Sequence, residues 1–157
     1  PAGQTEILRS YYEEAFEKLN TTWVVPPIEV SFYPYVGINH TIRVRNDGGE
    51  PHDMNMMKLA PGRTLADLQR FMNPERARRP GESDEPPPPL HELGSMVGGV
   101  AAMAPSMSAY FDAELTPGEY VLFCMVTAPD GRSHIEHGMI RQVRWAVQHA
   151  PRARGRG

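Results

Sequence analysis

Residues 118–139 read GEYVLFCMVTAPDGRSHIEHGM, and they are the most informative stretch of the chain. The run Tyr120–Val126 is rich in β-branched and aromatic residues, which predicts a strand that carries Cys124 near its end. Pro129-Asp130-Gly131 then makes a turn, and the sequence becomes strand-like again at Met139. The thiol of Cys124, the imidazoles of His134 and His137 and the thioether of Met139 therefore lie on or beside a loop between two strands.

Further strands are predicted on both sides of this stretch. Apolar and polar residues alternate over Ala109–Leu115 and Met139–Val147, and Thr116-Pro117-Gly118-Glu119 makes a turn before the central strand. Three upstream stretches are also extended, from their prolines, their alternation or their apolar character: Trp23–Val36, His40–Asn46 and Met54–Leu59. Many short strands joined by turns predict an all-β fold, and a β-sandwich is the architecture that suits them.

The composition limits the class of protein. The chain has 157 residues and 40% of them are apolar, which suffices for one domain with a core. Lys plus Arg number 16 and Asp plus Glu 19, so the net charge of −3 argues against a nucleic-acid-binding protein. No apolar run reaches the roughly 18 residues of a membrane-spanning helix. A single Cys excludes an internal disulfide.

The predicted sandwich occupies residues 23–147, and other segments flank or interrupt it. Residues 1–22 form a helical extension, because apolar side chains recur on one face of a helix over Gln4–Leu19. That helix either folds onto its own sandwich or docks onto a partner. Residues 75–89 are a Pro-rich and charge-rich insertion, and residues 148–157 form a basic, flexible tail.

One short inserted helix is also predicted. It begins at Thr64 and runs to Met72, where Asn73-Pro74 stops it. Thr64 and Asp67 have the spacing of a capping box, in which each side chain bonds a free backbone N–H of the first turn.

A second group of candidate ligands lies upstream of Cys124. Pro51-His52-Asp53 follows a predicted strand and a turn, so two loops at one end of a sandwich can bring His52 close to the later residues. Two imidazoles and one thiolate with a weak thioether ligand are the donor set that suits copper in blue-copper sites. The residues therefore indicate a copper site.

At these motifs the sequence resembles the cupredoxins, the plastocyanin-like type 1 blue copper family. Residues 117–124, PGEYVLFC, look like the family's strand into the copper Cys, and residues 134–139, HIEHGM, are similar to its His-x-x-x-Gly-Met ending. Nine residues separate Cys124 from His134, a long loop that is similar to the type 1 site of copper nitrite reductases. The resemblance implies a Greek-key sandwich with His52, Cys124, His134 and Met139 as ligands of one copper ion.

Three features depart from the family pattern or compete with it. His137 is a rival to His134, and we prefer His134 because its spacing to Met139 matches the family. Asp53 stands where an Asn is usual, and Met125 follows the Cys where a small hydroxyl residue is common. Residues beside the ligands tune or spoil a metal site.

The resemblance implies single-electron transfer, with no substrate transformed and hence no enzyme. It also implies an exported protein, periplasmic or extracytoplasmic, whose signal peptide is absent from a chain that begins at Pro1 as a processed or cut form. The expected partner is a redox protein or a membrane electron-transfer complex, reached through the N-terminal helix. A nitrite reductase would need a second copper site and a second domain, for which the chain is too short.

Other interpretations stay open. The extensions and departures also suit a copper-free accessory subunit on the periplasmic face of a photosynthetic reaction centre or respiratory complex. A thiol enzyme with a His base is the third interpretation, and copper storage is the fourth. Cys124 can equally be a buried core thiol. The remaining histidines are predicted to lie at the surface: His40, His91 and His149. The remaining methionines are predicted to pack against other side chains: Met54, Met56, Met57, Met96, Met103 and Met107.

Overall fold

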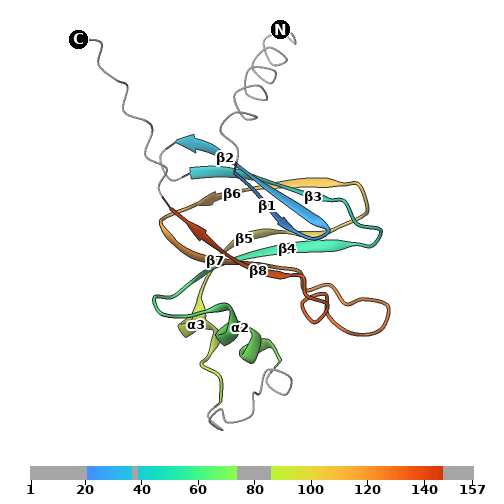
Figure 1. Cartoon of the computed structure of the whole chain (residues 1–157). Helices are drawn as coiled ribbons and strands as arrows, with labels where there is room; N and C mark the ends of the chain where they lie inside the picture. Colours follow the sequence, from blue (N-terminus) through green and yellow to red (C-terminus); the bar gives the residue numbers. More distant parts are fainter. Residues whose placement is uncertain (1–20, 37–38, 74–85, 147–157) are drawn as a thin grey trace, which may run out of the picture.

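The structure is a computed structural model that describes residues 21–36, 39–73 and 86–146. The predicted helix over 4–19 and the basic tail lie outside these ranges, as does most of the 75–89 insertion. The described residues form eight strands: β1 (Thr21–Val25), β2 (Ile28–Val36), β3 (Asn39–Asn46), β4 (His52–Leu59), β5 (Gly94–Met103), β6 (Ser108–Glu114), β7 (Gly118–Phe123) and β8 (Ile140–Trp145). Helices α2 (Leu65–Met72) and α3 (Leu90–Leu93) lie between β4 and β5 (Figure 1).

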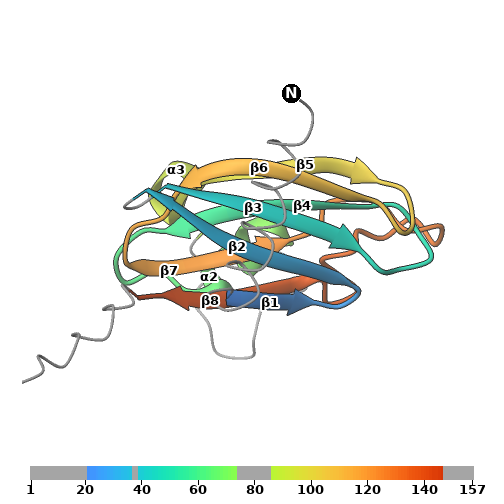
Figure 2. The same ribbon diagram turned by 90° about the horizontal axis from the view of Figure 1, so that it is seen from above.

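The strands form two four-stranded sheets, so the prediction of an all-β fold is confirmed. One sheet has the order β1-β2-β3-β6, and the other has the order β5-β4-β7-β8. Neighbouring strands run antiparallel throughout. The two sheets lie face to face, and several of their connecting loops meet at the end that holds the loop after β7 (Figures 1 and 2).

The main core fills the space between the sheets. It consists of apolar side chains at alternate positions of the strands, which point inward. Side chains from both sheets meet there: Val30 and Phe32 of β2, Ile42 and Val44 of β3, Met54 and Met56 of β4, and Tyr120 and Leu122 of β7. Full burial of such a side chain contributes about 1.5–3 kcal/mol relative to exposure. Met54 and Met56 are therefore core residues, as predicted.

The strand bounds differ from the predictions in informative ways. Strand β7 ends at Phe123 and β8 begins at Ile140, so the candidate ligands at 124 and 139 stand just beyond the two strand ends. The extended stretch 23–36 is a pair of strands separated by a turn at Pro26-Pro27, and β1 begins at Thr21. Residues 94–103, whose two methionines were predicted to pack, form the edge strand β5.

Burial corrects three side-chain predictions. His40 is buried, with only 7% of its surface exposed, because it shares the inward face of β3 and meets the Trp145 ring edge-on at 4.9 Å. Met96 on the edge strand β5 and Met107 in the turn after it are about half exposed, whereas Met103 is buried as predicted. The other two histidines predicted at the surface are His91, which is exposed, and His149, which lies outside the described residues.

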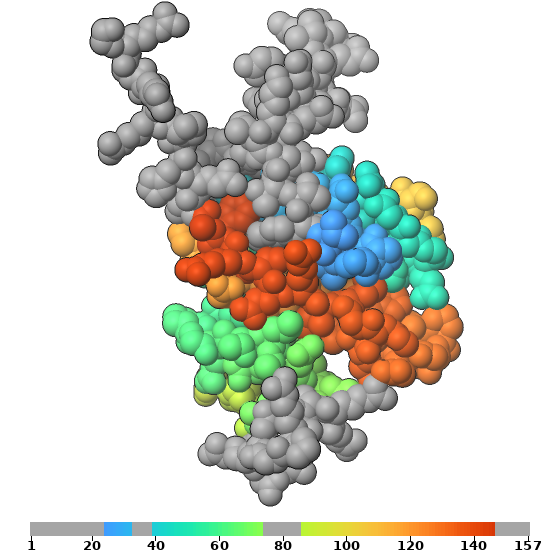
Figure 3. Space-filling model, in the orientation of Figure 1, coloured from blue at the N-terminus to red at the C-terminus, as the bar shows by residue number. Residues whose placement is uncertain are grey.

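Helices α2 and α3 add a third layer on the outer face of the second sheet. A separate apolar cluster joins Met57 and Leu59 of β4 and Val121 and Phe123 of β7 to Leu68 of α2. The predicted capping box is present, since Thr64 accepts from the Asp67 N–H and the Asp67 carboxylate accepts from the Thr64 N–H. In Figure 3 the green segment that contains the helices lies against the red and orange surface of the last strand and its preceding loop. Strands β4 and β7 are thus buried on both faces.

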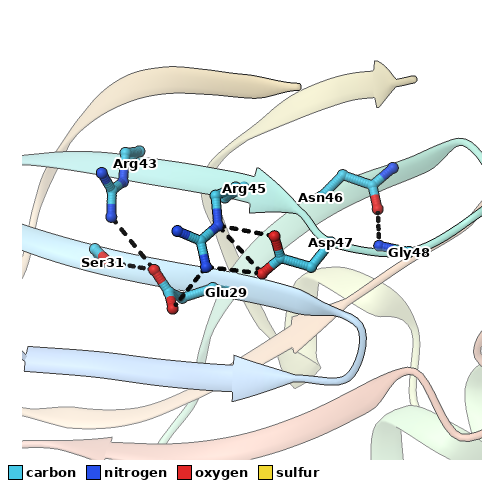
Figure 4. Close-up of polar contacts among 7 residues, drawn as sticks. All are labelled: Glu29, Ser31, Arg43, Arg45, Asn46, Asp47 and Gly48. Carbon is cyan, nitrogen blue, oxygen red and sulfur yellow. Dashed lines mark hydrogen bonds and ion pairs between the residues drawn. The ribbon is translucent and has the colours of Figure 1, made fainter. Parts of the chain in front are cut away.

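The outer face of the first sheet is polar instead. Glu29 pairs with Arg43 at 3.3 Å, and Arg45 pairs with Asp47 at 2.9 Å (Figure 4). Such partly exposed pairs contribute at most about 1 kcal/mol each. These ion pairs face solvent, so this side of the first sheet does not contribute to the core.

The hydroxyl of Tyr120 anchors the turn that precedes β7. It donates to the Thr116 carbonyl at 2.7 Å and accepts from the Thr116 N–H at 3.1 Å, and the residue is fully buried. We expect Tyr120→Phe to lower the free energy of unfolding by about 1–3 kcal/mol, because both backbone groups lose their partner. Urea denaturation measures this. Tyr110→Phe, at an exposed tyrosine, is the matched control, and an equal loss in both variants would contradict the assignment.

Candidate metal centre

The fold brings three candidate ligands to one end of the sandwich. His52 is the first residue of β4, and Cys124 follows the last residue of β7. Because β4 and β7 are paired, with Asn55 opposite Phe123, these two residues become neighbours although they are far apart in the sequence. His134 arrives from the long loop between β7 and β8, as the sequence analysis expects.

The ligand atoms of these residues form a small triangle. His52 Nδ1 lies 2.8 Å from His134 Nδ1, and Cys124 Sγ lies 3.3 Å from His134 Nδ1 and 3.8 Å from His52 Nδ1. A point inside the triangle is about 2 Å from all three atoms, close to the bond lengths of imidazole nitrogen and thiolate to zinc, about 2.0–2.3 Å. All three residues are at least 95% buried. The cluster can therefore hold one metal ion.

Met139, the fourth predicted ligand, stands beside this triangle. Its carbonyl accepts from the Cys124 N–H at 3.1 Å, and its own N–H donates to the His134 carbonyl at 2.9 Å. The side chain is buried and lines the same open hollow as His52 and His134. Its backbone thus ties two ligand residues together, and the residue lines the hollow.

His137, the rival to His134, is not part of the triangle. It is exposed at the rim of the hollow, where its Nε2 lies 3.0 Å from an Asp130 carboxylate oxygen. The structure therefore separates the two histidines of the loop, with His134 at the centre and His137 at the surface.

The loop after β7 is held by its own hydrogen bonds and by the third layer. The His134 N–H donates to the Val126 carbonyl at 2.8 Å, and the Glu136 carboxylate accepts from the Ser133 N–H at 3.0 Å. Ile135 packs into the cluster under α2, and Asn73 at the end of α2 donates to Glu136 at 3.3 Å. A long ligand loop is thereby fixed on both sides of His134.

Asn46 and Glu50 belong to the site, although the sequence analysis did not single them out. The buried Asn46 amide donates to the carbonyls of Glu50 and Met103 at 2.8 and 3.0 Å, and its oxygen accepts from the Gly48 N–H at 2.9 Å. It thereby fixes the turn before His52. An Asn that ends a strand before Asp-Gly-Gly was the available signal.

Two carboxylates contact the ligand residues. Glu50 Oε2 lies 3.3 Å from His134 Nε2, so the other ring nitrogen of that imidazole faces the triangle. Asp53 Oδ1 accepts from the Met125 backbone N–H at 2.8 Å, which links the His52 and Cys124 loops. A carboxylate behind a ligating imidazole is a common means of orienting it.

Burial sets the protonation of the site without metal. Burial raises the pKa of the Cys124 thiol to about 11, a hydrogen bond from the Val126 backbone lowers it, and the side chain of Asp53 raises it. Burial and then the neighbouring His134 lower the pKa of His52, against smaller raising effects of Glu50 and Asp53. At neutral pH Cys124 is a thiol and His52 is neutral. A buried thiol of high pKa is the opposite of a reactive nucleophile, which argues against a thiol enzyme.

Comparisons of the chain with protein-family models, curated proteins and solved structures find no match. Among the residues that the structure describes, no helix is long and apolar enough to cross a membrane. The chemistry of the His52, Cys124 and His134 side chains is therefore the basis for assigning a function.

Proposed function

We propose that this chain is a type 1 copper protein that carries single electrons, with a Greek-key, cupredoxin-like sandwich as its scaffold. The observation that carries the proposal is the buried triangle of His52 Nδ1, His134 Nδ1 and Cys124 Sγ. Two imidazoles and one thiolate in a trigonal set, with a thioether nearby, are the donors of blue-copper sites.

The donor set favours copper over structural zinc. A structural zinc site is usually closed by four strong ligands in a tetrahedron. Here three strong donors converge within the described residues, and the residues that line the same hollow include the buried Met139, which carries a thioether. Thioethers suit soft copper ions and are weak ligands for zinc.

Each side chain has a distinct role in this proposal. Bound copper would supply a reversible one-electron redox couple. Cys124 provides the thiolate, and imidazole nitrogens come from His52 at the start of β4 and from His134 in the loop after β7. Because the ligands are buried and their loops are fixed, the donors stay in place when the charge of the site changes. The Asn46 amide and the Met139 backbone maintain that arrangement.

The remaining parts of the proposal concern the surroundings of the protein. We place it in the periplasm or elsewhere outside the cytoplasm, with a redox protein or a membrane electron-transfer complex as its partner. It binds no nucleic acid and transforms no substrate. The statement on nucleic acid rests on the net charge of −3, and the other parts derive from the family resemblance of the ligand motifs.

One observation favours the second candidate, a copper-free accessory subunit of a photosynthetic or respiratory complex. The two imidazoles are already within hydrogen-bond distance of each other, at 2.8 Å, and so satisfy each other without a metal. A copper titration separates the two candidates. One copper per chain with an intense thiolate-to-copper band supports electron transfer, whereas a colourless protein with a free thiol supports the accessory subunit.

Substitution of the two loop histidines tests the assignment of His134. We expect His134→Ala to remove the visible band and to weaken copper binding more than the roughly 10–100-fold that loss of an outer partner costs. His137→Ala, the matched control at the rim, should change the affinity by less than about threefold, since it removes no ligand atom. Competition titration against a copper chelator measures both. Loss of copper in the His137 variant alone would overturn the assignment.

A further inference from the structure

Two carboxylates lie beside the ligand residues without belonging to the ligand set. The Asp53 carboxylate follows His52 in the chain and accepts from the N–H of Met125, the residue after Cys124, at 2.8 Å, and its charge contributes to the raised pKa of the Cys124 thiol. Glu50 lies 3.3 Å from the outer nitrogen of His134. One carboxylate is therefore anchored to the residue next to the thiol ligand, and another contacts an imidazole ligand.

These two anions are not neutralised by a Lys or Arg within the described ranges. The nearby guanidinium groups pair with other carboxylates, Arg45 with Asp47 and Arg132 with Glu136. Once Cys124 ligates as a thiolate, the centre therefore holds three negative charges beside two neutral imidazoles. The half-buried Asp53 is poorly screened and acts strongly on a bound ion, whereas Glu50, whose side chain is 51% exposed, acts more weakly.

We propose that Asp53 and Glu50 make this centre select divalent over monovalent metal ions, so that it stabilises Cu(II) relative to Cu(I) and also accepts Zn²⁺. The inference rests on the proposed metal centre and adds its charge preference. A divalent ion is attracted by all three anions, and its Coulomb energy with them is twice that of a monovalent ion at the same position. Copper held this way has a low reduction potential, and the protein passes electrons readily to its acceptor.

The test compares affinities for Zn²⁺ and for Cu(I), because neither measurement needs a visible band or electron transfer. Each ion is titrated against a chromophoric chelator, and Cu(I) is handled anaerobically with a reductant. We expect Asp53→Asn to lower the ratio of Zn²⁺ to Cu(I) affinity about tenfold. The same tenfold change in the ratio of Cu(II) to Cu(I) affinity raises the copper potential by about 59 mV. The asparagine oxygen can still accept from Met125, so the loop link is preserved.

Two further variants make the test specific. Glu50→Gln keeps an acceptor for His134 and should lower the ratio in the same direction. Asp130→Asn removes an exposed carboxylate from the rim of the same hollow, where it pairs with His137, and should change the ratio by less than about twofold because this carboxylate contacts no ligand residue.

The outcomes separate this inference from the proposed function. An unchanged ratio in folded Asp53→Asn and Glu50→Gln, or an equal change in Asp130→Asn, overturns the charge preference even if the copper protein is blue. A colourless copper complex whose Zn²⁺ to Cu(I) ratio falls as expected upholds the charge preference and overturns electron transfer. A wild-type protein that binds neither ion overturns both.

Discussion

Replacing Cys124 with serine should abolish the intense visible band of the copper complex and weaken copper binding by more than about a hundredfold. Cys124 is the one cysteine of the chain, so no other thiolate can supply the band. Serine has nearly the same shape but is a hard, neutral donor at neutral pH, which removes both the charge and the soft ligand. The expected loss exceeds the roughly 10–100-fold that follows from altering an outer-shell partner.

Absorption spectra and chelator competition on the copper-loaded proteins measure this effect. Met125→Ser is the matched control, because it changes the adjacent residue, which is about half exposed, and leaves all ligand atoms in place. Urea denaturation of both metal-free variants shows whether either substitution harms the fold. A serine variant that keeps the wild-type affinity would mean that copper binds elsewhere on the chain.

The affinity for metal should rise about tenfold per pH unit from pH 7 to pH 9, a total of about a hundredfold. Burial raises the pKa of the Cys124 thiol to about 11, so metal binding must displace a thiol proton throughout this range. His52 adds no slope, because burial lowers the pKa of its imidazole and leaves it neutral above pH 7. The expected stoichiometry is one proton released per metal bound.

Chelator competition at several pH values measures the slope, and a pH-stat records the released protons. The Cys124→Ser protein should show a nearly flat profile, because its hydroxyl stays protonated. If the wild-type slope flattened near pH 8, the thiol would have an ordinary pKa, and the environment assigned to Cys124 would be wrong.

The alternation of apolar residues predicted most of the sandwich. Val30 and Phe32, like Ile42 and Val44, occupy the inward face that their spacing indicates. The same alternation places His40 on the inward face of its strand, together with Ile42. Its polar side chain led to the wrong prediction of a surface position. For His40, the position in the alternating pattern was therefore a better guide to burial than the polarity of the side chain.

The candidate site was predicted in part. The soft residues around Cys124 and the motif at His52 indicated which side chains meet, because strand ends gather loops at one end of a sandwich. Glu50 was not predicted. Its contact with His134 depends on the conformation of the turn before His52, which the buried Asn46 fixes by hydrogen bonds. Helix α2 was predicted from local signals, but which sheet it covers depends on contacts with residues far away in the sequence, such as Val121.

The double-sided burial of β4 and β7 has a consequence for how the chain finds its strand pairing during folding. In a strand with one solvent-exposed face, a shift of the pairing register by one residue exposes the apolar side chains to water. The wrong register is therefore unfavourable. Strand β4 has less of that safeguard, because Met54 and Met56 enter the core on one of its faces and Met57 and Leu59 enter the core on the other. Glycine supplies another one, since a Cβ at Gly94 or Gly99 would collide with the backbone of β4. A β5 strand displaced by one residue would place Leu93 or Ser95 in the gap left for Gly94, and mispaired chains would be rejected by this clash.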